Sequence, residues 1–157
     1  MNQAWKAALR RAICEVFENL CFMMPSPTDG SIPPDAGSLS RVVLAVDFGG
    51  AGRGTLHLTL PDTMIASVAS SMLGEDGPLE LSEQYEAACE LANIVCGNVL
   101  PLIAGDRAVF DLQSPRVIAT MDADLGDLFD VSARVLLDEG LVTASIALQI
   151  CDARGAE

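Results

Sequence analysis

The sequence predicts an α+β fold, in which long helices pack on a mainly antiparallel β-sheet. Three observations favour this fold class. Apolar residues recur at helical spacing in residues 3–23 and 82–104, apolar and polar residues alternate between residues 42 and 60, and residues 109–150 are rich in strand-forming sequence. Because neither an internal repeat nor a domain boundary is visible, we expect a single domain over residues 1–157.

The first predicted helix covers residues 3–23, and Pro25 and Pro27 end it. Its apolar face packs either into the core or against a second copy of the chain. The apolar residues of the first helix recur every three or four positions, as in an amphipathic helix: Trp5, Leu9, Ile13, Val16, Phe17 and Leu20.

The first helix is followed by a predicted exposed loop, because residues 25–40 are rich in Pro, Gly, Ser and Asp.

Residues 42–48 and 56–60 are predicted to form the two strands of a hairpin, joined by the glycine-rich link from Gly49 to Gly54. This link is not a phosphate-binding loop, because it lacks the Lys-Ser/Thr pair and leads into a strand instead of a helix. His57, the only histidine, falls on the polar side of its strand. We therefore expect His57 at the surface, and we find no Ser-His-Asp set.

The next elements are two helices. Pro61 and Asp62 open a short helix that runs to about Leu73, and a long helix covers residues 82–104. Ser82 is the expected N-cap of the long helix, and Gly105 is its expected stop.

The chain then becomes rich in strands. Short strands are expected at 109–112 and 117–120, and a final hairpin pairs 129–137 with 141–150 across a turn at residues 138–140.

Charge excludes several classes of function. The chain has 22 acidic and 9 basic residues, a formal net charge of −13, so it will repel nucleic acid and anionic membranes.

The sequence shows no segment that is expected to enter a membrane. No run reaches the roughly 18–20 apolar residues of a membrane span. Glu15 and Glu18 interrupt the apolar stretch of the first helix, which argues against a signal peptide. We expect a cytoplasmic protein.

Cysteines and aspartates give no evidence of a metal site. The five cysteines contain no CxxC pair, and two pairs of them are seven residues apart, so we expect reduced, buried thiols. Four aspartates around Gly126 lack the EF-hand pattern. We interpret this acidic cluster as a solvated turn, with weak cation binding as the alternative. The cysteines are Cys14, Cys21, Cys89, Cys96 and Cys151. The aspartates of the cluster are Asp122, Asp124, Asp127 and Asp130.

The long second helix carries the candidate site. Glu86, Glu90, Asn93 and Gly97 follow one another at spacings of three or four, which places them in one stripe along the helix. Gly97 inside a helix costs roughly 1 kcal/mol relative to Ala. It is explained either by close helix packing or by the approach of another backbone. Pro101, four residues later, predicts a bend.

The side chains of Glu90 and Asn93 can bind and orient other groups, but they offer few ways to take part in a reaction themselves. The carboxamide of Asn93 can hold and orient a water molecule, and the carboxylate of Glu90 can anchor a cationic side chain. Neither group is a nucleophile or a strong base. The pair therefore suits a substrate that is already reactive and brings its own metal, such as an acyl phosphate on an aspartate.

The segment Glu90-Leu91-Ala92-Asn93-Ile94-Val95-Cys96-Gly97-Asn98 resembles the ExxN signature of the CheC, CheX and FliY phosphatases, including the Gly-Asn that follows it. The chain length and the order of helix, strand pair, helices and strands also resemble CheX. The resemblance implies a CheX/CheC-like domain that dephosphorylates the aspartyl phosphate of a CheY-like response regulator.

By this resemblance, Glu90 pairs with a lysine of the regulator, and Asn93 positions the attacking water. We assign Glu86 and Gly97 to partner binding. The resemblance implies no cofactor of the chain's own, since the regulator supplies Mg²⁺, and a homodimer is plausible because CheX proteins pair. Glu86 departs from the CheC-type pattern, which has Asp or Ser there, and Pro115 is one residue nearer than the CheC spacing. The first helix has no ExxN, so we expect one site per chain.

Three alternatives stay open. In the first, Glu90 and Asn93 form a polar helix face without a function. In the second, the chain is a non-catalytic CheX-like module that docks a response regulator or a flagellar switch component. In the third alternative, the chain is an acidic scaffold subunit whose partner is not a receiver.

Overall fold

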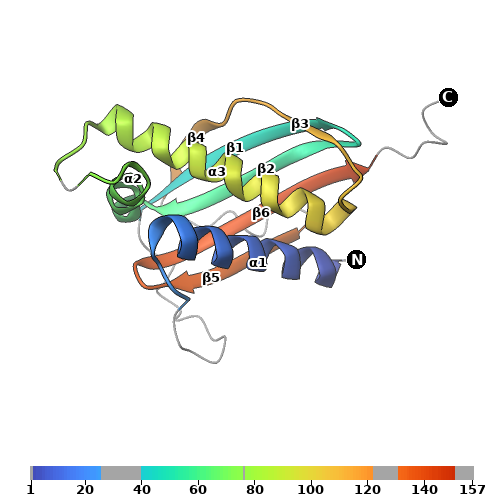
Figure 1. Ribbon diagram of the computed structural model, residues 1–157, viewed down its shortest axis with the longest axis horizontal. Helices are drawn as coiled ribbons and strands as arrows, with labels where there is room; N and C mark the ends of the chain where they lie inside the picture. Colours follow the sequence, from blue (N-terminus) through green and yellow to red (C-terminus); the bar gives the residue numbers. More distant parts are fainter. Residues whose placement is uncertain (1, 26–39, 76, 122–130, 151–157) are drawn as a thin grey trace.

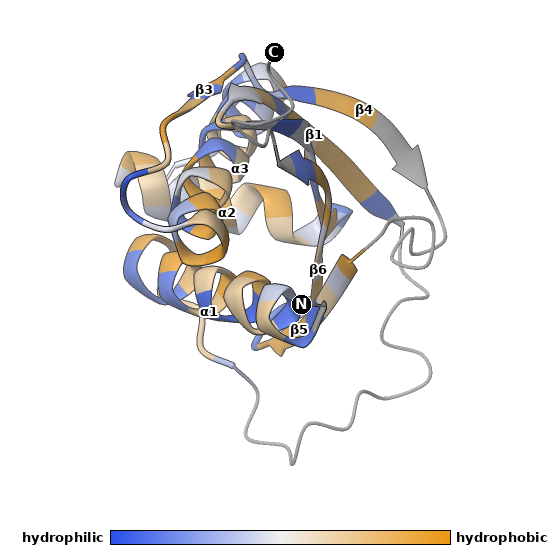
Figure 2. Cartoon of the chain, turned by 90° about the vertical axis from the view of Figure 1, so that its right-hand side faces the viewer, coloured by the Kyte–Doolittle hydropathy of each residue, from blue (hydrophilic) through white to orange (hydrophobic). Residues whose placement is uncertain are grey.

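A layer of helices covers one face of a six-stranded sheet in the computed structural model of the chain (Figure 1). Seen from the side, the helices occupy one half of the molecule and the sheet the other (Figure 2). The structure describes residues 2–25, 40–75, 77–121 and 131–150. The arrangement confirms the predicted α+β class, with long helices on an antiparallel sheet.

The elements follow the predicted order. The helices are α1 (Asn2–Cys21), the 3-10 turn η1 (Asp62–Met64) that continues into α2 (Ile65–Leu73), and α3 (Leu81–Ala104). The strands are β1 (Arg41–Gly50), β2 (Gly52–Pro61), β3 (Phe110–Leu112), β4 (Arg116–Met121), β5 (Val131–Leu137) and β6 (Gly140–Ile150).

The sheet has the order β3-β1-β2-β6-β5, and every pairing in it is antiparallel. Both predicted hairpins are present, as β1 with β2 and as β5 with β6. Strands β3 and β4 share the outer edge of β1, where β4 pairs with residues 41–45 and β3 with residues 48–50. The rings of Phe48 and Phe110 meet edge to face, with centroids 5.8 Å apart, and hold β3 in place.

The core lies between the helices and the sheet. In β1, β2, β5 and β6, every second residue points into it, as the period of two predicts. The apolar face of α1 is buried there, so it belongs to the core of this chain. Core residues include Leu9, Ile13 and Phe17 of α1, Val42, Leu44 and Val46 of β1, Leu56 and Leu58 of β2, and Val142, Ala144 and Ile146 of β6.

The outer face of the sheet is also buried at its centre. Val43 and Ala45 are fully buried, although the alternating pattern places them away from the helices. Arg41 is fully buried too, and its Nη2 donates hydrogen bonds to the carbonyl oxygens of Thr59 (3.2 Å) and Leu141 (2.7 Å). The guanidinium therefore fastens β1 to β2 and to the start of β6.

His57 lies on this outer face, as its place in the strand predicts, but it is half-buried instead of fully exposed. The alternation of apolar and polar residues along a strand predicts the face of the sheet on which a side chain lies, but it does not predict whether other residues cover that face. Burial lowers the pKa of His57, and the positive charge of Arg116 lowers it further.

Two helix boundaries differ from the prediction. Helix α1 ends at Cys21, two residues early, because Phe22 adopts a left-handed conformation with φ 57°. The N-cap of α3 is Glu80, with no side-chain cap bond, so Ser82 lies inside the first turn. Gly105 ends α3 as predicted, at φ 92°.

Helix α3 is long and apolar enough to cross a membrane, the one such helix in the described part of the chain. Its apolar side chains lie on the sheet, as expected for the central helix of an α+β layer. Residues 26–39 of the predicted loop, the aspartate cluster at 122–130 and Cys151 lie outside the described residues. Pro25, the first residue of that loop, forms an isolated antiparallel bridge with Leu137.

Candidate functional site

The predicted stripe of α3 lies on the side of the helix that faces away from the sheet. Glu86, Glu90 and Gly97 are exposed, and Asn93 is partly exposed. The structure thus places all four side by side along one outward helix face, as the helical spacing predicts.

Helix α3 is a rigid support for these residues, because its opposite side is part of the core. Leu91, Ala92, Val95 and Val99 are fully buried there. The helix continues without interruption through Pro101 to Ala104. Each site residue therefore stands on a backbone that cannot shift without disturbing the packing on the sheet.

The side chains of Glu90 and Asn93 are uncommitted. Neither forms a hydrogen bond or an ion pair with any other residue in the described part of the chain. Asn98, by contrast, donates its amide to the carbonyl oxygen of Ile94 at 2.7 Å. The carboxamide and the carboxylate of the pair are therefore available to a visiting molecule.

Gly97 opens the surface one turn after Asn93. A methyl group added at Gly97 would meet no atom of the described residues within 4 Å outside its own helix. The alternative that Gly97 serves close packing between helices of this chain is therefore wrong. The missing side chain leaves the helix backbone accessible from outside.

A cavity that the sequence did not predict lies beside the pair, between α2 and α3. Its volume is about 350 Å³, and we call it the acidic groove. Its walls come from two consecutive helices, and only the packing of α2 on α3 brings their side chains together. The lining residues are Met72, Leu73, Glu83, Glu86, Ala87 and Glu90.

Burial raises the pKa of every helix cysteine in the described ranges. All four in the described ranges are free thiols: Cys21 and Cys96 are buried, and Cys14 and Cys89 are half-buried. Burial raises the pKa of Cys21 to about 11 and that of Cys96 to about 12. A thiol that stays protonated at neutral pH is a poor nucleophile, so these two cysteines are weak candidates for the chemistry of the site.

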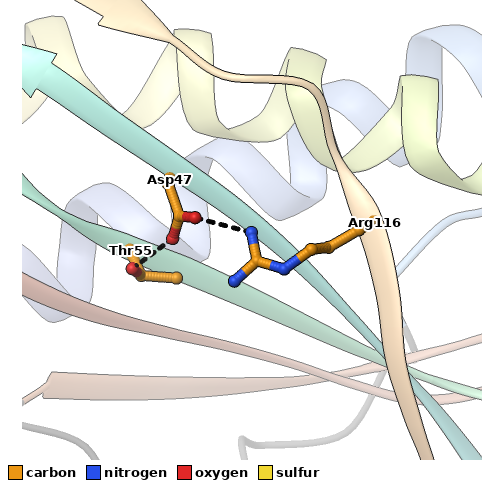
Figure 3. Close-up of polar contacts among 3 residues, drawn as sticks. All are labelled: Asp47, Thr55 and Arg116. Carbon is orange, nitrogen blue, oxygen red and sulfur yellow. Dashed lines mark hydrogen bonds and ion pairs between the residues drawn. The ribbon is translucent and has the colours of Figure 1, made fainter.

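A second polar cluster lies on the outer face of the sheet (Figure 3). The carboxylate of Asp47 accepts a hydrogen bond from the Thr55 hydroxyl (2.6 Å) and a charge-assisted one from Arg116 (2.6 Å). These two bonds, with the hydroxyl bond the larger cause, lower the pKa of Asp47. Every group in the cluster is engaged, and the cluster ties β4 to the β1–β2 hairpin.

Within the described ranges, no group of three or more His, Cys, Asp or Glu side chains is arranged to hold a metal ion. The acidic residues of the groove therefore do not form such a site.

Comparison with known proteins identifies the family. The sequence from residue 42 to residue 129, more than half of the chain, matches the family described as "Chemotaxis phosphatase CheX". This chain belongs to the CheX family. The matched region contains α3 with Glu90 and Asn93. A search of curated proteins finds no match.

Solved structures of CheX proteins share the fold. The chemotaxis protein CheX of Desulfovibrio desulfuricans superposes with a TM-score of 0.68 at 17% identity, over 92% of this chain and 99% of the other. CheX of Vibrio vulnificus gives a TM-score of 0.64 at 17% identity, over 92% and 96%. CheX of Borrelia burgdorferi, solved as a CheX–CheY–BeF3–Mg²⁺ complex, gives 0.54 at 19% identity, over 91% and 96%.

Proposed function

We propose that this CheX family member hydrolyses the aspartyl phosphate of a CheY-like receiver domain. One observation carries the proposal. Glu90 and Asn93 lie one turn apart on the exposed face of a helix whose other face is core, and no described residue engages their side chains. A polar pair held ready in this way suits a protein that inserts both groups into a partner's site.

The proposed reaction is an in-line attack of water on the phosphorus atom. A new P–O bond forms to the water oxygen, and the P–O bond to the aspartate breaks, which returns the aspartate as a carboxylate. Inorganic phosphate leaves with both protons of the water and exchanges one of them with solvent. The carboxamide of Asn93 orients the water through its carbonyl oxygen and its amide group. The carboxylate of Glu90 pairs with a cationic side chain of the receiver and fixes the register of docking.

Catalysis of this kind is mostly positioning, because the acyl phosphate is already activated. The chain supplies no cofactor in this proposal, and Mg²⁺ belongs to the receiver, where it neutralises charge on the phosphoryl oxygens. The Borrelia burgdorferi complex of CheX with CheY supports the choice of partner.

Two further residues of α3 belong to the proposed docking surface. Gly97 gives the receiver's backbone room beside Asn93, and Glu86 adds negative charge at the same surface. The cytoplasm is the proposed place of action, and a homodimer is the proposed assembly.

The decisive variant is Asn93→Ala. With a CheY-like receiver phosphorylated by acetyl phosphate, we expect the native chain to shorten the phosphate lifetime. The variant should lose that acceleration by on the order of 10²-fold or more, because the water is no longer held in line. Asn19→Ala is the control, since Asn19 is an exposed asparagine of α1, far from the pair in sequence. Circular dichroism should show the native fold in both variants.

An Asn93→Ala protein as active as the native chain would contradict the proposal. Binding of the phosphorylated receiver by the native chain, with no change in its phosphate lifetime, would favour the docking module instead.

A further inference from the structure

We infer that the acidic groove between α2 and α3 is a second recognition site, which takes a lysine or arginine side chain of the receiver beside its phosphorylated pocket. This inference rests on the proposed function. It adds Leu73 and Glu83, which lie outside the ExxN signature, as residues that select the receiver.

One part of the groove is apolar. Ala87 is buried, Met72 packs partly against the core, and Leu73 is 48% exposed at the last position of α2. Gly74 follows in a left-handed conformation and ends the helix there. An apolar side chain that stays this accessible gains free energy when another apolar group covers it.

The other part of the groove is negatively charged. Glu83, Glu86 and Glu90 occupy successive turns of α3. No lysine or arginine of the described residues forms a salt bridge with any of them. Three carboxylates without a cation favour a visitor that brings positive charge.

These two properties together select one kind of occupant. Lysine and arginine carry a charged head on a long aliphatic stem, so the stem covers Leu73 and Met72 while the head meets the carboxylates. A bare metal ion would leave the apolar wall uncovered, and the described residues offer no metal-binding arrangement. A second copy of the chain would bring its own net charge of −13 toward an acidic surface.

The position of the groove connects it to the proposed reaction. Glu90 belongs both to the groove and to the outward stripe with Asn93. A cationic side chain held in the groove therefore lies next to the proposed catalytic pair. Its binding would orient the receiver before Asn93 reaches the phosphorylated pocket.

The test separates KM from kcat with a phosphorylated CheY-like receiver as substrate. We expect Glu83→Lys to raise KM about tenfold and Leu73→Ser to raise it about fivefold, with kcat unchanged, because both act before the chemical step. Glu18→Lys is the matched control, an exposed glutamate of α1 outside the groove. It should leave KM within about twofold of the native value. The KM of Glu83→Gln should rise less steeply with ionic strength than that of the native chain.

A receiver variant provides the reciprocal test. Among single Lys→Glu and Arg→Glu variants around the receiver's pocket, one should restore the KM of the Glu83→Lys chain. A KM for Glu83→Lys equal to that of Glu18→Lys overturns the inference. So does the failure of every receiver variant to restore a KM that Glu83→Lys has raised. A change in oligomeric mass on Leu73→Ser without a change in KM also overturns it, because the groove would then join two copies of the chain.

The two proposals fail in different ways. A native chain that leaves the phosphate lifetime unchanged contradicts the phosphatase, and Kd for the phosphorylated receiver then tests the groove on its own. A Kd raised by Glu83→Lys supports the groove, whereas an unchanged Kd overturns it.

Discussion

Asp47 shows how one charged residue holds an edge strand. Its two hydrogen bonds, from Thr55 of β2 and Arg116 of β4, join three strands at one carboxylate. About half of each ion-pair side chain is accessible to solvent, so water and salt weaken the attraction. A pair of this kind contributes roughly 0.2–1 kcal/mol to the free energy of unfolding.

The lowered pKa of Asp47 predicts the pH range of that contribution. The folded pKa lies below the unfolded value of about 4, so the stabilisation is present above that value and is lost as the pH falls through the folded pKa. Urea unfolding should show Asp47→Asn less stable than the native chain by about 1 kcal/mol or less at pH 7. The difference should shrink below about pH 4.

Asp111→Asn is the control, because Asp111 is an exposed strand carboxylate with no ion pair among the described residues. A difference between native and Asp47→Asn that stays constant from pH 7 to pH 3 would contradict the assignment.

The side of a helix or strand on which a side chain lies was predictable where the repeat of that element alone determines it. The turn of 3.6 residues places Glu90 and Asn93 opposite the buried Leu91 and Val95, and the structure agrees. The outward direction of His57 was predictable in the same way. Its partial burial was not, since burial depends on contacts between distant segments.

At the level of elements, α2 depends on the way it ends. Gly74 adopts φ 67°, and its backbone N–H donates to the carbonyl oxygen of Ser70. This left-handed turn fixes the end of α2, where Met72 and Leu73 form the apolar side of the acidic groove. The shape of the groove therefore depends on a single backbone conformation.

Gly74→Ala should lower the free energy of unfolding by about 1–2 kcal/mol, because a residue with a Cβ is strained at that φ. Gly77→Ala is the matched control, three residues later in the same connection, where φ is not in the left-handed range and the added methyl also meets nothing within 4 Å. Denaturant midpoints compare the two variants. Equal midpoints would show that the left-handed conformation is not required.

Element types were predictable, and some boundaries were not. Alternation predicts the strands of the first hairpin and helical spacing predicts the two long helices, but Ser82, the expected N-cap, lies inside α3, which begins at Leu81. Serine is favoured at the N-cap but also occurs in the first turn, so its presence fixes the start of a helix only to within one or two residues. The end of α1 at the left-handed Phe22 has no signal in the sequence, because an aromatic residue rarely adopts that conformation.

At the scale of the whole molecule, charge opposes folding. A net charge of −13 on a chain of 157 residues repels itself in the compact state. Raising the salt concentration from 0.01 M to 0.15 M shortens the Debye length from about 30 Å to about 8 Å. The free energy of unfolding should therefore rise over that range.

Urea unfolding in NaCl, repeated in KCl, measures this effect. Equal gains in the two salts identify screening, since a bound ion would distinguish them. A stability that falls or stays constant with salt would contradict the role of the net charge.

The family-level arrangement was predictable from the order of the elements and the ExxN segment, and CheX membership confirms it. Two features of the whole molecule were not. Strands β3 and β4 share the edge of β1, and α2 lies beside α3 so that Leu73 and Glu83 line one groove. The first feature depends on contacts between segments far apart in the chain, and the second depends on the angle at which α2 packs against the next helix. Local patterns encode neither.

The position of the Glu–Asn pair on the central helix has a consequence for heat inactivation. Because Leu91 and Val95 anchor the same turns of α3 that carry Glu90 and Asn93, the site has no hinge through which it could melt by itself. Loss of the geometry of the pair therefore requires loss of the core. Heating should then remove the proposed phosphatase activity and the fold in a single transition.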